Sequence, residues 1–205
     1  DFEGAGAGVM MIGFSRFGQM VSQVLLSGGT DVTIIDHSAD RVRAAARFGF
    51  RIYFGDGRRK EVLEASGIRH AKIVAVCTNG AASTDHIVNL IRAEFPHVRL
   101  FVRSYDRAHT LSLRERDVEY ELRETVESAL IFGGKTLQAL GTSEEIASEI
   151  VEDVRRRDEE RLAIQAVKGI YAGNDKMRVR PVTPEPLVKP KRESQRLDHD
   201  SEQSA

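Results

Sequence analysis

The stretch from residue 9 to residue 36 constrains the fold of this chain most. It begins with the apolar run 9–12, continues through a glycine loop at 13–18, and then has apolar residues at helical spacing up to Ser27. A second apolar run, 32–35, ends in an acid, Asp36. Strand, glycine loop, helix, strand and acid, in this order, are typical of a βαβ unit that binds a dinucleotide.

This order predicts a phosphate site and a ribose site close together. The amides of the glycine loop and the N-terminus of the following helix attract anions. Asp36 is placed to accept hydrogen bonds from a ribose diol, which disfavours NADP. Ser15 stands where the usual pattern has its second glycine. Its side chain narrows the approach of a pyrophosphate, while its hydroxyl can donate to a phosphate oxygen. We therefore predict an adenine nucleotide, with AMP favoured over NAD(H). The alternative is a tight turn that only packs the helix on the sheet.

Strands and helices continue to alternate as far as residue 103. Apolar runs at 51–54, 73–77 and 100–102 read as strands, and the segments between them as helices. Alternation of this kind predicts an α/β fold, a Rossmann-like parallel sheet with helices on both faces. A helix at 108–116, a short sixth strand at 118–120 and two long helices, the first at 123–140 and the second starting at Thr142-Ser143, should follow. We expect a linker at 1–8, a nucleotide-binding domain at 9–122, a helical dimerisation and regulatory extension at 123–168 and a disordered tail at 169–205.

Composition narrows the classes of partner. Of 205 residues 41% are hydrophobic, and the net charge of −1 gives no case for nucleic-acid binding. The single cysteine, Cys77, fits a reducing compartment and is expected in the core, and the six histidines lack metal-ligand spacing, so no metal is expected. The Gly/Ala-rich start, without a methionine, suggests a fragment of a larger protein cut at a linker.

Several motifs together resemble a known family. They are the loop 13–19, Asp36-His37, Phe54-Gly55-Asp56, the segment 94–97 and Arg123-Glu124-Thr125. They are similar to the cytosolic TrkA-N domain, also called KTN or RCK-N, of Kef-type, glutathione-gated potassium/proton antiporters. The resemblance implies a homodimer that binds an adenine nucleotide and gates a transmembrane antiporter domain of the same parent chain. It also implies a place at the cytoplasmic face of the bacterial inner membrane.

The pattern and the resemblance together give two sets of candidate residues. The nucleotide-binding set is Gly13, Phe14, Ser15, Arg16, Phe17, Gly18, Asp36, His37, Asp56, Gly57, Thr78 and Asn79. The set for a small acidic second ligand is Arg16, Arg103, Arg114 and Asp158. Asp158 falls where glutathione-gated members have an asparagine, and a carboxylate would repel an anionic tripeptide. Asp56 can instead cap a helix beginning near Arg58, and Thr78 and Asn79 can instead shape their loop.

The length after residue 103 argues against an enzyme. An NAD-linked oxidoreductase needs a second lobe that holds substrate against the nicotinamide, and only a few helices and a tail follow here. We therefore expect a regulatory binding module with no catalytic residues. The runner-up is a regulatory NAD-binding subunit of a Trk-type potassium uptake system. Gly133-Gly134 in the apolar stripe of 123–140 either permits close helix approach across a dimer or breaks the helix.

Overall fold

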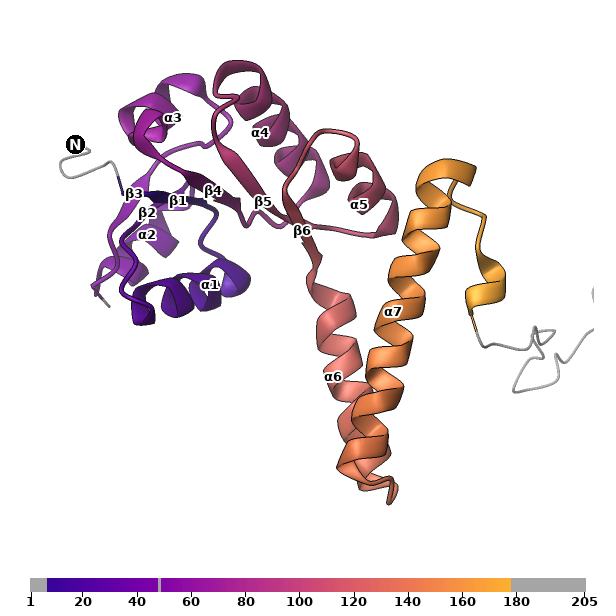
Figure 1. Ribbon diagram of the computed structural model, residues 1–205. Coiled ribbons are helices and arrows are strands. Elements are labelled where there is room, and N and C mark those ends of the chain that lie inside the picture. The colour runs from indigo at the N-terminus through magenta and orange to yellow at the C-terminus, as the bar shows by residue number, and fades with distance from the viewer. Residues whose placement is uncertain (1–6, 48, 178–205) are drawn as a thin grey trace, which may run out of the picture.

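Six short apolar segments pair into one parallel sheet. The computed structural model describes residues 7–47 and 49–177. The strands are β1 (Val9–Ile12), β2 (Val32–Asp36), β3 (Ile52–Phe54), β4 (Ile73–Val76), β5 (Arg99–Ser104) and β6 (Tyr120–Arg123). Their order in the sheet is β3-β2-β1-β4-β5-β6, so the direction of winding reverses between β1 and β4. This confirms the predicted Rossmann-like parallel sheet (Figure 1). A short sixth strand is also present, but it lies at 120–123 and not at the predicted 118–120.

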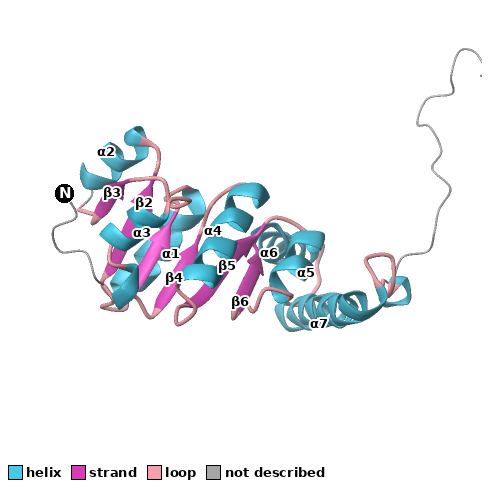
Figure 2. Ribbon diagram, turned by 90° about the horizontal axis from the view of Figure 1, so that it is seen from above, coloured by secondary structure: helices cyan, strands magenta, loops and turns pink. Residues whose placement is uncertain are grey.

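Helices cover both faces of the sheet (Figures 1 and 2). They are α1 (Arg16–Ser27), α2 (Ala39–Arg47), α3 (Lys60–Ala65), α4 (Ala81–Glu94), α5 (Arg107–Arg114), α6 (Glu124–Ala139) and α7 (Glu144–Lys168), with single 3-10 turns at Ile68–His70 and Asn174–Lys176. Successive residues of a strand point to opposite faces. Met10 therefore packs with Ile87 of α4 in one core cluster, and Met11 packs beside Val21 of α1 in the other.

The helices α6 and α7 form an antiparallel hairpin that projects from the sheet (Figure 1). α7 begins at the predicted cap, where the Ser143 side chain accepts a hydrogen bond from the Ile146 amide at 3.3 Å. α6 runs unbroken through Gly133 and Gly134, so of the two alternatives for these glycines the helix break is absent. A Cβ on Gly134 would lie 2.9 Å from Cγ2 of Val151. The close approach that this glycine permits is therefore between α6 and α7 of one chain.

The segment after α7 folds back onto that helix. The Gln165 amide donates to the carbonyl oxygens of Ile170 and Ala172, at 2.5 and 3.2 Å. Lys176 forms an ion pair with Glu160 at 3.0 Å. The disordered tail predicted from residue 169 therefore does not begin there, because residues 169–177 are tied down by α7. The rest of that tail, 178–205, and residues 1–6 of the predicted linker lie outside the described residues.

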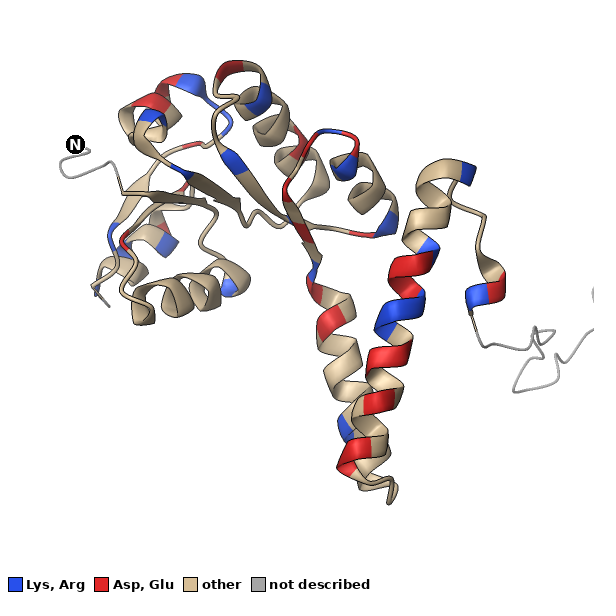
Figure 3. Ribbon diagram, in the orientation of Figure 1, with Lys and Arg blue, Asp and Glu red and all other residues tan. Residues whose placement is uncertain are grey.

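Charged residues line much of α7 in successive acidic and basic groups (Figure 3). Arg157 pairs with Asp153 and Arg156 with Glu160, each at 2.9 Å and four residues apart. Such pairs support an exposed helix by a few tenths of a kcal/mol each, roughly 0.3–0.5. In the described part of the chain no helix combines the length and the apolar character that a membrane span requires.

Candidate nucleotide-binding site

A cavity of about 270 Å³ opens at the carboxyl ends of β1, β2, β3 and β4. This edge lies where the strand order reverses, which is where ligands bind in open α/β sheets. Eight of the twelve predicted nucleotide-binding residues line it. They are Gly13, Ser15, Asp36, His37, Asp56, Gly57, Thr78 and Asn79.

Two glycines shape the loop after β1. Gly13 has φ +98°, and a Cβ there would lie 3.0 Å from the backbone of Cys77 and Thr78, so a side chain is excluded. A Cβ on Gly18 would lie 2.2 Å from the Gly13 carbonyl oxygen. Gly18 therefore brings the first turn of α1 close to β1. The helix N-terminus, with its unpaired amides, is placed beside the cavity.

Ser15 supplies the one unsatisfied hydroxyl of this loop within the described residues. It is the N-cap residue of α1, but its side chain makes no capping hydrogen bond. Its Oγ is buried and has no hydrogen-bond partner. Because a buried hydroxyl without a partner is costly, an acceptor from a ligand would stabilise this arrangement. The residues present therefore fit an anionic group at the start of α1.

Asp36 ends β2 and is buried, with its carboxylate held by four donors. Oδ2 accepts from the Phe14 amide at 2.7 Å and from Arg41 Nε at 3.0 Å. Oδ1 accepts from the Ser38 amide at 2.7 Å and from Arg41 Nη2 at 2.9 Å. Burial alone would raise the pKa of Asp36, but the Arg41 guanidinium and the two amides outweigh it and hold the pKa below its usual value.

Asp56 lines the same cavity from the turn after β3. Its carboxylate accepts from the Arg58 amide at 3.0 Å and pairs with the Arg58 guanidinium at 2.8 Å. The hydrogen bonds from Arg58 lower the pKa of Asp56 to about 2 despite partial burial. Asp56 does not cap α3, whose N-cap residue is Arg59. Its charge is therefore retained at the cavity rim over the whole physiological pH range.

Thr78 and Asn79 are both positioned by hydrogen bonds. Thr84 donates its hydroxyl to the Gly80 carbonyl, so Thr78 must be the donor in the 2.6 Å bond that joins the two threonines. Asn79 Oδ1 accepts from Arg103 at 2.6 Å. The loop-shaping role considered for this pair is therefore present, and both residues also line the cavity.

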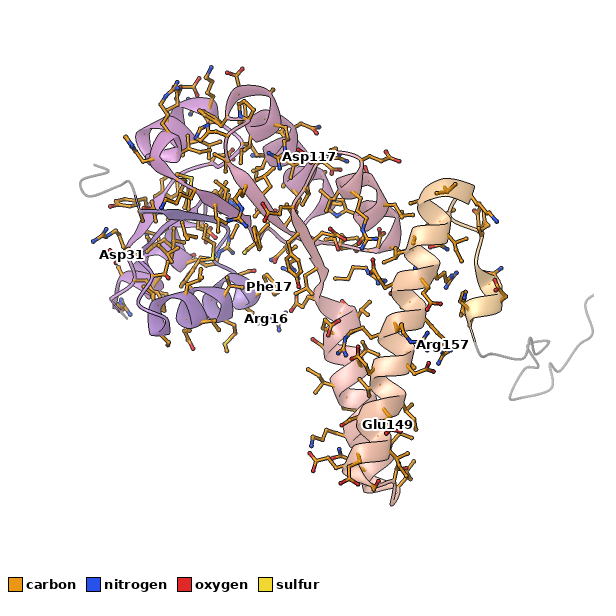
Figure 4. All side chains as sticks on the ribbon, in the orientation of Figure 1. Arg16, Phe17, Asp31, Asp117, Glu149 and Arg157 are labelled. Carbon is orange, nitrogen blue, oxygen red and sulfur yellow. The ribbon has the colours of Figure 1, made fainter. Side chains whose placement is uncertain are left out.

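The remaining four predicted residues do not line the cavity. Phe14 is buried, with its ring 5.1 Å from that of Phe50. Gly18 packs against Gly13. Arg16 is exposed, and Phe17 follows it at the start of α1 (Figure 4). Their backbone amides still belong to the loop and to the first helical turn. A backbone role towards a ligand is consistent with these positions.

The structure does not bring the four second-ligand candidates into one site. Arg103 lies 5.2 Å over the Phe17 ring and pairs with Glu124 at 2.5 Å. Arg114 and Asp158 instead share a separate cavity of about 360 Å³ between α5, β6, α6 and α7. The exposed Arg16 lines neither of these two cavities.

The carboxylate of Asp158 is neutralised by ion pairs within the chain. It pairs with both Arg107 and Arg123. Burial and the positive charges of Arg123 and Arg161 lower the pKa of Arg107 to about 10, so the Arg107 guanidinium stays charged at neutral pH. The repulsion expected of Asp158 towards an anion is therefore offset by its two partners.

Sequence reasoning missed two arginines of the nucleotide cavity, Arg41 and Arg58. The sole signal for either was a basic residue that follows an acid at or just after a strand end, five residues later for Arg41 and two for Arg58. The described residues contain no cluster of His, Cys, Asp or Glu that could hold a metal ion. Cys77 is buried, and burial raises the pKa of its thiol to about 12, as expected of a core cysteine.

Comparison with known proteins identifies the class. The model of the TrkA-N domain family matches residues 9–121, more than half of the 205 residues. The chain therefore belongs to the TrkA-N family, as its motifs predicted.

Two curated relatives and one solved structure place it more closely. The glutathione-regulated potassium-efflux system protein of Haemophilus influenzae is 39% identical over 195 residues, 95% of this chain and 31% of that protein. KefC of Salmonella arizonae is 34% identical over 133 residues, 65% of this chain and 22% of that protein. The chain thus spans less than a third of the length of these curated relatives. The Kef CTD of Shewanella denitrificans in its AMP-bound form has a TM-score of 0.71 at 28% identity, covering 77% of this chain and 96% of that one.

More distant structures share the fold alone. The GsuK channel bound to NAD has a TM-score of 0.57 at 12% identity, covering 64% of this chain and 24% of that one.

Proposed function

We propose that this chain is the cytosolic nucleotide-binding regulatory domain of a potassium/proton antiporter. The observation that carries the proposal is the cavity at the switch point of the sheet, which is lined by both Ser15, with its unpartnered hydroxyl, and Asp36. A phosphate at the start of α1 and a ribose at Asp36 match these two groups. The Kef relatives and the AMP-bound Kef neighbour support the same assignment.

AMP is the ligand that the site fits best. The cavity of about 270 Å³ lies just below the range typical of ligand pockets, about 300–1,000 Å³. Ser15 stands where a dinucleotide pyrophosphate needs backbone approach. Both features favour a mononucleotide, with NAD(H) as the weaker ligand.

Calorimetric titration of the 205-residue chain with AMP, ATP and NADH tests this assignment. We expect AMP to bind with one site per chain and more tightly than NADH. AMP should also raise the thermal unfolding temperature, because a ligand that binds only the folded state stabilises it. Absence of both a binding heat and a thermal shift with every nucleotide would overturn the proposal.

Dimerisation through the hairpin of α6 and α7 is the second part of the proposal. Leu130 and Leu137 are half-buried, but Ile131, Phe132 and Leu140 of α6 remain exposed, as do Ile146 and Ile150 of α7. Clustered exposed apolar side chains of this kind mark interaction surfaces. A second copy of the chain is the partner that we infer for them.

Gating then follows as a two-state switch. Nucleotide binding favours one arrangement of the dimer, and the parent chain passes this arrangement to its transmembrane antiporter domain. Potassium efflux from cells expressing the parent protein tests this step. Asp36→Ala in the parent should change the efflux rate. An unchanged rate would show that nucleotide binding at this site does not control transport. Because we propose a regulatory binding module, we expect the chain to bind nucleotides without catalysing a reaction on them.

A further inference from the structure

The acceptor capacity of Asp36 is completely used within the chain. A carboxylate offers about four lone-pair sites. Four donors occupy them, two from the backbone amides of Phe14 and Ser38 and two from the Arg41 guanidinium, all between 2.7 and 3.0 Å. A ribose hydroxyl that donates to Asp36 must therefore replace one of these donors.

The two kinds of donor differ in how easily they move. The Phe14 amide belongs to the glycine loop, where Gly13 and Gly18 fix the backbone, and the Ser38 amide lies two residues from Asp36 itself. Arg41 reaches Asp36 from the first turn of α2 with a long side chain that is 37% exposed. Its guanidinium also lines the nucleotide cavity. Arg41 is thus the donor that a ligand can displace, and the two amides keep the carboxylate oriented when it leaves.

We propose that Arg41 sets the ribose specificity of the site by competing with the nucleotide for the Asp36 carboxylate. The inference rests on the proposed nucleotide function of this cavity. Each hydrogen bond that the ribose gains at Asp36 replaces one that Arg41 gives up, so the net preference for a ribose diol is small in the wild-type chain. When the guanidinium is removed, the same acceptor sites on Asp36 become free, and the site should prefer a ribose diol by the full strength of the new hydrogen bond.

Neutral nucleosides provide the sharpest test. Adenosine and 2′-deoxyadenosine carry no phosphate, so a change in their affinity does not report attraction between Arg41 and an anion. Their dissociation constants are measured by competition against AMP, for the wild type, Arg41→Ala and Arg41→Lys. We expect Arg41→Ala to raise the affinity ratio of adenosine to 2′-deoxyadenosine by about tenfold, the effect of one hydrogen bond to a charged group. Arg41→Lys, which lacks the bidentate fork, should give an intermediate ratio and retains the test if the alanine variant folds poorly.

Arg43→Ala is the matched control. Arg43 lies on the same helix, is exposed and pairs with Asp40, outside the cavity lining. Its removal should leave the nucleoside ratio unchanged. An Arg41→Ala ratio equal to that of the wild type, or a loss of adenosine affinity in that variant, would overturn the competition. Wild-type binding of AMP would still stand in that case, whereas a wild type that binds no adenine nucleotide would remove the proposed function as well.

Discussion

Asp36 links the stability of the fold to its ligand site at the scale of a single residue. Asp36→Asn keeps the shape but removes the charge that Arg41 and two amides share. We expect the unfolding free energy at pH 7 to fall by about 1.5–3 kcal/mol, the range for hydrogen bonds to a charged group. The folded pKa of Asp36 is lowered, so its contribution is complete above the unfolded value of about 3.9 and is lost as the pH falls through the folded pKa.

Urea unfolding of both proteins between pH 2.5 and 7 measures this difference. The gap between wild type and variant should be constant above about pH 4 and close at lower pH. Asp40→Asn serves as the control, because the Asp40 side chain is 89% exposed and its removal should change stability little. A gap that persists unchanged to pH 2.5 would contradict the assigned role.

At the same scale, we expect Ser15 to limit the size of the nucleotide that binds. Ser15→Gly removes the side chain from the path of a pyrophosphate, so the affinity of NADH relative to AMP should rise severalfold. The fold should tolerate the change, because the Ser15 side chain makes no capping bond and glycine at an N-cap costs only a few tenths of a kcal/mol. Titration with both nucleotides gives the ratio. A ratio equal to that of the wild type would show that Ser15 does not set ligand size.

At the scale of an element, alanine substitutions at the two adjacent glycines of α6 distinguish the effect of packing from that of helix propensity. A Cβ on Gly134 would meet Val151 at 2.9 Å, whereas a Cβ on Gly133 would meet nothing within 4 Å. Gly133→Ala should therefore stabilise the chain by about 0.5–1 kcal/mol through helix propensity alone. Gly134→Ala should lose that gain to overpacking, which costs about 1–3 kcal/mol.

Thermal unfolding is measured for Gly133→Ala, Gly134→Ala, Val151→Ala and the double variant of Gly134→Ala with Val151→Ala. Val151→Ala makes room for the added methyl group, so the double variant should be more stable than the sum of the single changes predicts. Equal stabilisation by both glycine substitutions would show that α6 and α7 are not in close contact at this point.

The whole molecule should be a dimer that depends on the apolar surface of the hairpin. Ile131 and Phe132 are 63% and 77% exposed, so their replacement by Glu should not disturb the monomer core. We expect Ile131→Glu with Phe132→Glu to give monomers that still bind AMP, because the cavity lies at the sheet edge. Light scattering at tens of micromolar reports the mass. Val167→Glu, at another exposed apolar position of α7, should remain dimeric, and a monomeric wild type would refute the dimer.

Much of the candidate site was predictable because the order of strands, glycines and acids along the chain fixes it. A strand followed by Gly13, a helix that starts three residues after this glycine and a strand that ends in Asp36 form a βαβ unit that is almost always right-handed. Gly13, Asp36, Asp56 and Thr78 follow four different strands, and parallel strands end at the same edge, so these residues gather around one cavity.

The sequence by itself thus determined the sheet, its edge and the residues that follow each strand, since periodicity and chain order carry that information. Only the tertiary structure decided which side chains meet across elements. Arg41 covers Asp36 from the next helix, Arg107 and Arg123 enclose Asp158, and Gln165 holds the backbone of Ile170. Such pairs join residues by long, freely rotating side chains. Their partners are set by the distances between packed elements, which no local pattern of residues encodes.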